Sequence, residues 1–401
     1  MTDGGLLDDL LVVDLSRNLP GPLVSRLLSD LGARVLKVEE PKLGDPSRHL
    51  PSAGGGPSSL AAMLLAGHES IALNLKKDAA RQSLEELLIT ADVLVESFRP
   101  GTLERLGLAP DELRKRYPRL IICSVSGWGQ EGPEAHRAGH DLTYQAVAGS
   151  LAGARGMPAA QTADIVAAWS ATCSVLAALH RRQRDGQGCW IDQALLDAAG
   201  HASIMAWAAE ADGPKADGEP LLLTGAIPCY NLYPTKEGGR LALAALEPRF
   251  WKRFCLALGR KDLLLKQYQG DGEVHRQVSE IVASRTREEW AEFLSDHDIP
   301  ADPVLSASEA RAHPQVQARD LMREAEDGLP RLGFPALFDG ERPRVDAACP
   351  GLGEHTDPLA SEFSLAADLS ARKRRAAGIG RRFSFKRWAL ALAGKAVPRS
   401  S

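Results

Sequence analysis

The feature that most constrains the fold is an alternation of short apolar runs with helix-like segments. The runs that predict buried strands are residues 11–15, 35–38, 71–73, 93–95 and 120–122. After the breaker cluster Leu19-Pro20-Gly21-Pro22, leucines recur at helical spacing, and Asp78 is placed to cap a second helix. Short apolar strands that alternate with amphipathic helices predict a parallel sheet covered on both faces.

The rest of the chain predicts a second, smaller domain. A long apolar helix is expected from Asp164 to Arg181, then a strand at 190–192 and a helix at 193–205, before the composition turns polar at 212–215. A chain of 401 residues is long enough for two cores. We therefore expect an α/β fold with a Rossmann-like large domain and a smaller α+β domain. The expected boundaries are 1–210 (large), 225–330 (small), 331–377 (return to the large domain) and 378–401 (basic tail).

Two nucleotide-binding fingerprints are missing from the sequence. The turn after the first strand, residues 16–22, lacks G-x-G-x-x-G, and no G-x-x-x-x-G-K-[ST] occurs. The sheet is therefore expected to resemble a Rossmann fold in layout only, without a nicotinamide or P-loop site.

Composition indicates an ordinary soluble globular protein, with 44% hydrophobic and 25% charged residues. The acidic start lacks the basic region of a secretory signal, and no apolar run is expected to span a bilayer. The six cysteines are scattered, so we expect free thiols, no metal site and a cytoplasmic location.

Charge is unevenly distributed along the chain. Ten basic and no acidic residues follow Asp368, which leaves the rest of the chain strongly acidic and a poor nucleic-acid binder. The tail mixes bases with aromatics, and contact with an anionic membrane is one interpretation of this pattern. A mobile tail, or one that packs on a dimer, is the preferred interpretation.

An imidazole and two carboxylates form the candidate chemistry, at His140, Asp141 and Asp164. A neutral histidine and a protonated aspartate that face each other can exchange protons on opposite faces of one carbon. Asp164 stands at the head of an apolar helix, so a plain N-cap role is the alternative.

Several ordered motifs together resemble family III coenzyme A transferases, the group that includes α-methylacyl-CoA racemase. The motifs are Val13-Asp14-Leu15-Ser16, Pro20-Gly21-Pro22, Leu31-Gly32-Ala33, Lys37-Val38-Glu39, Gly44-Asp45, residues 91–101, Glu104-Arg105-Leu106-Gly107, residues 126–133, residues 299–304 and residues 351–356. They extend over roughly residues 10 to 375, and their order makes the resemblance specific.

The resemblance implies an interlocked homodimer that binds acyl-CoA along the large domain. It implies no tightly bound cofactor, because coenzyme A arrives as part of the substrate. By motif, Asp164 matches a carboxylate that attacks the acyl thioester in transferases and carries a proton in racemases. The residues expected at the coenzyme A site are Lys37, Lys76, Phe98, Arg99, Arg105 and Asp141. Cations suit an anionic ligand, although each could be a solvated surface charge.

The residue that acts opposite Asp164 distinguishes the racemase branch of the family from the transferase branch. Gly139-His140-Asp141-Leu142-Thr143-Tyr144 is similar to the racemase motif whose histidine is the opposing base, and residues 245–250 resemble the segment whose glutamate supports it. This resemblance implies a 2-methylacyl-CoA racemase with His140 and Asp164 as bases and Glu247 as orienter. A solvated loop carboxylate is the alternative for Glu247. A CoA-transferase and a catalytically silent CoA-binding protein are the alternative functions.

Overall fold

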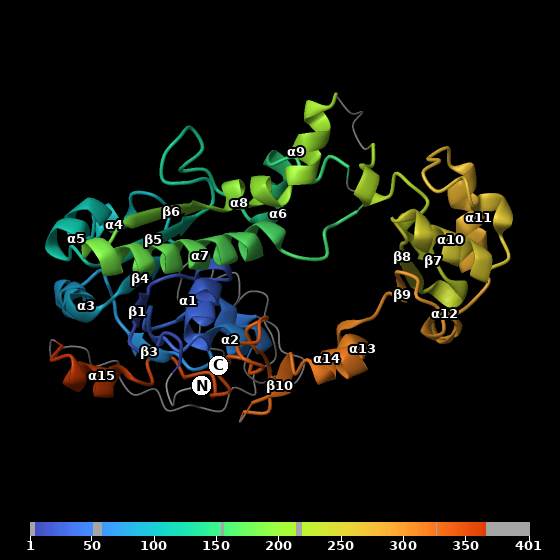
Figure 1. The fold of residues 1–401 in the computed structure, drawn as a ribbon. Coiled ribbons are helices and arrows are strands. Elements are labelled where there is room, and N and C mark those ends of the chain that lie inside the picture. Colours follow the sequence, from blue (N-terminus) through green and yellow to red (C-terminus); the bar gives the residue numbers. More distant parts are fainter. Residues whose placement is uncertain (1–4, 51–57, 154–155, 214–218, 326, 366–401) are drawn as a thin grey trace, which may run out of the picture. The chain divides into compact units, whose positions relative to one another are not determined.

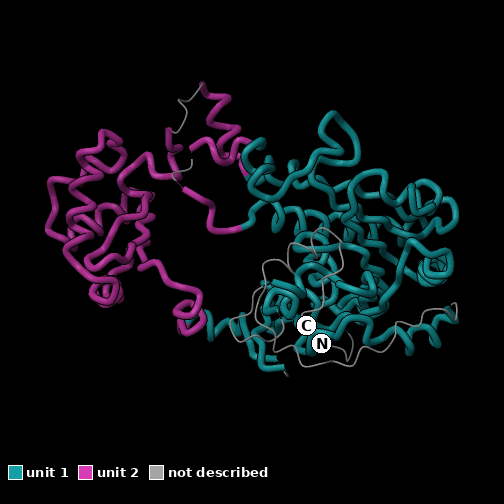
Figure 2. Tube along the Cα trace, turned by 180° about the vertical axis from the view of Figure 1, so that it is seen from behind, with its two compact units in different colours: residues 1–148, 161–202, 315–401 teal, residues 149–160, 203–314 magenta. Residues whose placement is uncertain are grey.

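The computed structural model describes residues 5–50, 58–153, 156–213, 219–325 and 327–365. The chain forms two compact units, shown in teal and magenta in Figure 2. Unit 1 comprises residues 1–148, 161–202 and 315–401, and unit 2 comprises 149–160 and 203–314. The chain thus enters unit 2 earlier than the polar stretch at 212–215 suggests, and it also does so between His140 and Asp164. The basic tail at 378–401, and any membrane contact through it, lies outside the described residues.

A six-stranded parallel sheet forms the centre of unit 1 (Figure 1). Its strands are β1 (Leu11–Asp14), β2 (Arg34–Glu39), β3 (Glu69–Ala72), β4 (Val93–Glu96), β5 (Ile121–Ser126) and β6 (Trp190–Ala194). The order β3-β2-β1-β4-β5-β6 is that of a doubly wound fold, and the direction of winding reverses between β1 and β4. The predicted parallel sheet is confirmed.

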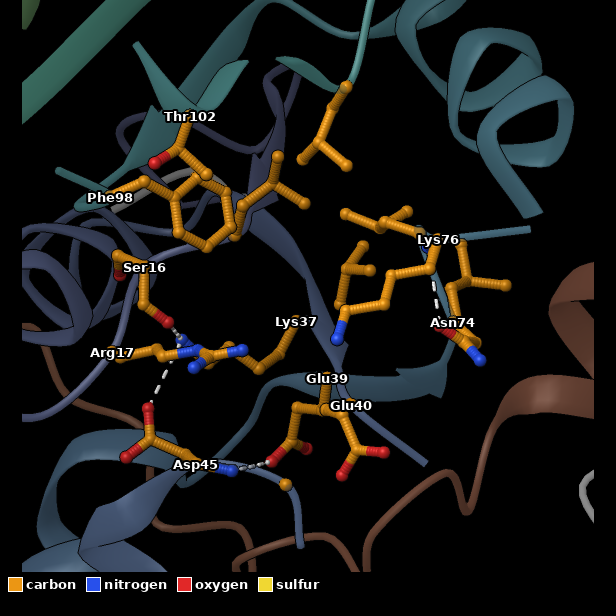
Figure 3. A pocket seen from close by; sticks show the side chains of 16 residues that line it. Ser16, Arg17, Lys37, Glu39, Glu40, Asp45, Asn74, Lys76, Phe98 and Thr102 are labelled. Carbon is orange, nitrogen blue, oxygen red and sulfur yellow. Dashed lines mark hydrogen bonds and ion pairs between the residues drawn. The ribbon is translucent and has the colours of Figure 1, made fainter. Parts of the chain in front are cut away.

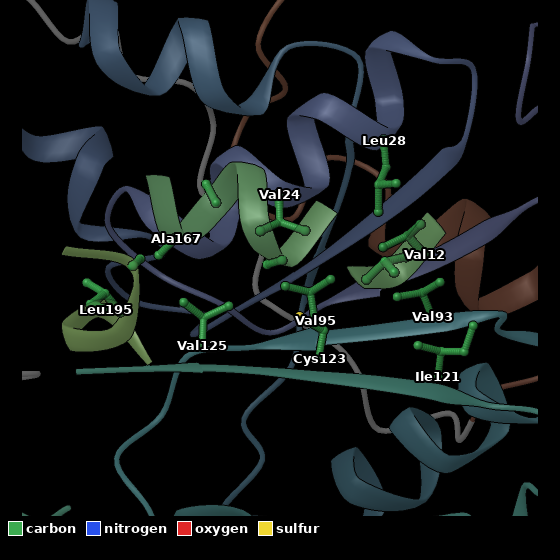
Figure 4. Close-up of a cluster of buried hydrophobic side chains, with 14 of the residues drawn as sticks. Val12, Val24, Leu28, Val93, Val95, Ile121, Cys123, Val125, Ala167 and Leu195 are labelled. Atoms are coloured by element: carbon green, nitrogen blue, oxygen red, sulfur yellow. The ribbon is translucent and has the colours of Figure 1, made fainter. Parts of the chain in front are cut away.

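Both faces of this sheet are buried, because successive strand residues point to opposite sides. Val12, Val93 and Ile121 belong to one hydrophobic core, which the side chains of α1, α7 and α8 complete (Figure 4). The next residue along each strand belongs to a second core, which α3 and α15 complete. This two-sided burial explains why the strands appear in the sequence as unbroken apolar runs.

The helices of unit 1 begin in places that simple breaker rules miss. They are α1 (Pro20–Asp30), α2 (Ser59–Leu65), α3 (Asp78–Thr90), α4 (Thr102–Arg105), α5 (Pro110–Arg116), α6 (Asp141–Val147), α7 (Thr162–Asp185), α8 (Leu195–Ala202), α14 (Pro314–Ala318, from Gln315 on) and α15 (Thr356–Glu362). The expected break at Pro20 is wrong, because proline fits the first helical turn, where its missing N–H is not needed. The expected cap at Asp78 is also wrong, since Asp78 is the first helical residue after Lys77. A short hairpin, β10 (Met322–Glu324) and β11 (Pro330–Leu332), completes the unit.

Helix α7 is apolar and long enough to cross a membrane by length and composition alone. The expectation that no segment would meet that test is therefore wrong. Ala163, Ala167 and Ala171 of α7 are fully buried in the first core of unit 1. A core position accounts for the apolar character of the helix without a membrane.

Unit 2 is an α+β domain with a three-stranded antiparallel sheet. Its elements are α9 (Ile204–Ala211), β7 (Tyr230–Pro234), β8 (Arg240–Ala244), α10 (Pro248–Ala257), α11 (Glu273–Val282), α12 (Arg287–Ser295), β9 (Ala301–Pro303) and α13 (Ala307–Ala312). Trp251 and Trp290 are its largest buried apolar side chains. The single helix expected at 193–205 is two helices, because the chain breaks at Ser203 between α8 and α9.

Candidate active site

A pocket lies at the carboxyl ends of β1, β2, β3 and β4 in unit 1 (Figure 3). It has a volume of about 250 Å³, and Arg17, Glu40, Asn74 and Phe98 line it, each just beyond the end of a strand. Ligands of doubly wound folds bind where the winding of the sheet reverses, which is the place where β1 and β4 meet. The pocket is therefore the candidate nucleotide-binding site of the unit.

The floor of the pocket is a buried ion-pair network centred on Lys37. The Lys37 ammonium donates to Asp14 Oδ2 at 3.0 Å and to the Ser16 carbonyl oxygen at 2.6 Å, and it lies 3.6 Å from Asp45 Oδ2. Burial opposes ionisation of Asp14, but Lys37 and Ser16 outweigh it and lower the pKa of Asp14. Lys37, expected as a ligand of phosphate, is thus already balanced by carboxylates and shapes the pocket from below.

A second pair holds the pocket wall at the end of β2. Arg48 donates to both carboxylate oxygens of Glu39, each at 2.7 Å, and Ser70 donates to Glu39 Oε2 at 2.6 Å. Burial alone would raise the pKa of Glu39, but the Arg48 guanidinium and the Ser70 hydroxyl lower it. Both carboxylates at the pocket base therefore carry fixed negative charge with matched cations.

The mouth of the pocket brings together some of the residues expected to contact coenzyme A, but not all. Lys76 and Phe98 line it with Lys37, whereas Arg99 and Arg105 are exposed and do not line it. Arg105 donates to the hydroxyl of Thr102, which does line the pocket. Sequence reasoning missed Arg17, whose guanidinium stacks 5.8 Å from the centre of the Phe98 ring. Its place in the turn that follows the first strand is the signal that the sequence offers.

His140 lies at the start of α6, on the side of unit 1 built from α6, α7 and α8. It is exposed and precedes the first helical residue, Asp141. The Thr143 hydroxyl accepts the His140 backbone N–H at 3.0 Å and donates to the His140 carbonyl oxygen at 2.7 Å. The imidazole itself is therefore open to a ligand, while its backbone is fixed to the helix.

Asp164 is the third residue of α7 and is half-buried. The N-cap position belongs to Gln161, so the N-cap interpretation of Asp164 is wrong. Instead, Asp141 Oδ1 accepts the Asp164 backbone N–H at 3.2 Å, while Asp141 Oδ2 accepts the Gln145 side-chain amide at 2.6 Å. Asp141, expected at the coenzyme A site, thus ties the start of α6 to the start of α7.

The Asp164 carboxyl is poised to exchange a proton. Burial and the adjacent Asp141 carboxylate raise its pKa to about 7. Among the described residues, the groups that shift this pKa include no cation. A carboxyl with a pKa near 7 can act as donor or acceptor at neutral pH, which is the property of a general acid or base.

Glu247, expected to orient His140, belongs to unit 2. It immediately precedes α10, is exposed, and makes no side-chain capping hydrogen bond there. Its assignment to the site remains a prediction. Within the described residues, no group of three His, Cys, Asp or Glu side chains converges as a metal site would.

Comparison with known proteins places this doubly wound α/β chain among enzymes of acyl-CoA chemistry. The model of CoA-transferase family III matches residues 7–356, and the chain belongs to that family. Acetyl-CoA:oxalate CoA-transferase of Acetobacter aceti is 30% identical, over 90% of this chain and 96% of that one. Alpha-methylacyl-CoA racemase of Homo sapiens is 31% identical, over 89% and 93% of the two chains.

Solved structures agree with this assignment. The crystal structure of a CAIB/BAIF family protein from Brucella suis matches with a TM-score of 0.78 and 27% identity, covering 90% of this chain and all of that one. The protein is thus an enzyme of a family whose members carry both transferase and racemase names.

Proposed function

We propose that this enzyme interconverts the two epimers of a 2-methylacyl-CoA thioester by moving the α-proton between His140 and Asp164. The observation that carries the proposal is the Asp164 carboxyl, whose pKa is raised to about 7 by burial and by Asp141. Asp141 directly follows His140, so its hydrogen bond to the Asp164 amide brings the two ends of the motif together.

The proposed reaction needs one group on each face of the α-carbon. One group removes the α-proton, and the electron pair moves into the thioester to form an enolate. The other group then returns a proton to the opposite face, and the carbonyl re-forms with the inverted configuration. A protonated Asp164 can donate while neutral His140 accepts, and the exchanged protonation states run the reaction backwards.

The pocket above β1 to β4 supports the proposal by offering a place for the nucleotide part of coenzyme A. Its apolar wall includes Phe98 and Leu106, and Arg17 and Lys76 supply charge at the mouth. Guanidinium and ammonium groups bind phosphate oxygens. We propose that the nucleotide binds there, with coenzyme A as a part of the substrate and with no other cofactor.

A CoA-transferase is the second candidate, and the names of several relatives favour it. In that reaction Asp164 attacks the thioester carbonyl, the C–S bond breaks, and a mixed anhydride forms with release of the coenzyme A thiolate. The thiolate then attacks the Asp164 carbonyl and releases the first acid, which leaves an aspartyl-CoA thioester. A second carboxylate attacks that thioester, and the thiolate passes to its acyl group as Asp164 is released. A nucleophilic carboxylate must be ionised, so a pKa of about 7 suits proton transfer better than attack.

One experiment separates the two candidates. The protein is incubated with a 2-methylacyl-CoA in deuterated water without any free acid, and again with an added carboxylate. We expect deuterium at the α-carbon and a mixture of epimers without the acid. Transfer of coenzyme A to the acid with no α-deuterium would support the transferase instead. His140→Ala is expected to abolish interconversion, and undiminished interconversion would remove His140 from the mechanism.

We also propose that the working enzyme is an interlocked homodimer. Helix α9 has the sequence IMAWAAEA and contains no buried residue, with Ile204 and Trp207 more than 60% exposed. A second copy would cover this apolar surface. Light scattering at micromolar concentration and mass photometry at nanomolar concentration should both give the dimer mass. A monomer that appears on dilution would contradict the interlocked arrangement.

A further inference from the structure

Tyr144 fills the space behind the loop that carries His140 and Asp141. It lies one helical turn after His140 in α6 and is buried, with 5% of its surface exposed. Its ring meets Trp128 edge to face, with the ring centres 4.9 Å apart and the planes at 77°. Such an arrangement is favourable for aromatic pairs and restricts the ring to one orientation.

Two glycines make room for this ring. A Cβ atom at Gly127 would lie 2.2 Å from the Tyr144 hydroxyl oxygen, and a Cβ atom at Gly139 would lie 2.6 Å from Tyr144 Cε1. Neither glycine has a left-handed backbone. Glycine is therefore required at both positions because of the contact with Tyr144 and not because of the backbone conformation.

Tyr144 and Gly139 are linked to His140 by one hydrogen bond and one peptide bond. Gly139 is bonded to His140, and the Tyr144 backbone N–H donates to the His140 carbonyl oxygen at 3.3 Å. Burial, together with the charge of the nearby Asp164, raises the pKa of Tyr144 to about 12. The phenol is therefore neutral at neutral pH.

We propose that Tyr144 is a positioning residue: its ring, seated against Gly127 and Gly139, fixes the backbone of His140 and Asp141 and thereby the relation of the imidazole to Asp164. This inference rests on the proposed function. It predicts that the shape of the ring matters and that the hydroxyl contributes little.

The test compares four variants by the rate of epimer interconversion and by the dissociation constant of coenzyme A. Tyr144→Leu and Gly139→Ala are each expected to lower kcat roughly 10- to 100-fold, because displacing a reacting group by about 1 Å costs that much. The double variant should recover at least about 5-fold over Gly139→Ala, since leucine leaves room for the new methyl group. Tyr144→Phe should retain most of the activity. Coenzyme A affinity should stay within about 2-fold in all four, because the nucleotide pocket contains none of these residues.

A matched control is Gly351→Ala, whose Cβ atom would meet only ordinary contacts, the nearest at 3.4 Å from Glu354. A readout independent of turnover is the imidazole NMR signal of His140, assigned by its loss in His140→Gln. The signal should shift in Tyr144→Leu and Gly139→Ala and return toward its original position in the double variant.

Three outcomes would overturn the inference. They are wild-type kcat in both single variants, no recovery in the double variant, and loss of coenzyme A affinity in parallel with kcat, which would indicate a general loss of structure. If Tyr144→Leu does not fold, Gly139→Ala and Tyr144→Phe still decide, because the inference requires opposite results from them. If the wild-type protein does not interconvert epimers, the proposed function fails, while the His140 signal still reports on the positioning.

Discussion

Two sites in unit 1 use carboxylates in opposite ways. At the pocket above β1 to β4, Asp14 and Glu39 each face a cation, and their pKa values are lowered despite burial. At the start of α7, the Asp164 carboxyl lies beside the Asp141 carboxylate, and burial and this neighbour raise its pKa to about 7. The difference lies in the neighbouring groups. A carboxylate paired with a cation stays ionised and stabilises the pocket, whereas a carboxyl beside another carboxylate holds a proton that it can exchange near neutral pH.

The largest expected effect separates chemistry from binding at these two sites. Asp164→Asn keeps the shape of the side chain but cannot exchange a proton, so epimer interconversion should fall by about 10³-fold or more. Coenzyme A affinity, measured by calorimetry, should stay within about 2-fold because Asp164 does not line the pocket proposed for the nucleotide. Interconversion within 10-fold of the wild-type rate would mean that Asp164 is no proton carrier.

The second prediction concerns the scaffold. Lys37→Met leaves Asp14 and Asp45 buried without their cation, and breaking a buried pair in this way costs about 3–5 kcal/mol of unfolding free energy. The measurement is urea unfolding at pH 7. Lys76→Met is the matched control: its ammonium is exposed, so stability should change by less than about 0.5 kcal/mol. Equal stability of the two variants would show that the network under the pocket carries no structural role.

The third prediction uses the pH dependence of stability. The folded pKa of Asp164 is about 7 and its ordinary value is 3.8, so the folded state binds more protons between these values and loses stability as pH rises through them. Asp164→Asn removes this loss. The variant should gain stability over the wild type as pH rises from 4 to 7, by at most about 4 kcal/mol, with no further gain above pH 8. A difference between the two proteins that does not change with pH would contradict the raised pKa.

The smallest effect tests the second cause of that pKa. Asp141→Asn removes the neighbouring charge and keeps an oxygen that can accept the Asp164 N–H. The pKa of Asp164 should fall, but by less than burial raises it, because burial is the larger cause. The limb of the kcat/KM profile near pH 7 should move to lower pH by less than about one unit. A limb that stays in place would assign it to another group.

Much of the fold could be predicted from the sequence, because parallel strands buried on both faces appear as unbroken apolar runs. Val12 and Val13 serve two different cores, so neither position tolerates a polar residue. The start of α1 at Pro20 was missed because proline breaks a helix interior but suits a first turn. Residues 149–160 belong to unit 2, and no hydrophobic periodicity in the sequence predicts this assignment.

The candidate site was only partly accessible from sequence. Motifs identified His140 and Asp164, but the bridge through Asp141 depends on two helices meeting, and the raised pKa depends on burial. Lys37 is expected from its motif to face a ligand, and no local sequence pattern predicts that Asp14 and Asp45 form ion pairs with it. Ion-pair partners that lie far apart in the sequence cannot be predicted from local motifs.

The most direct test of the central claim follows α-deuterium uptake into each pure epimer by His140→Gln and Asp164→Asn, in deuterated water and without a free acid. If His140 and Asp164 serve opposite faces of the α-carbon, each variant should keep exchange with one epimer and lose it with the other, and the two variants should be complementary. The account would be contradicted if both variants lost exchange with the same epimer. It would also be contradicted if either variant exchanged both epimers equally.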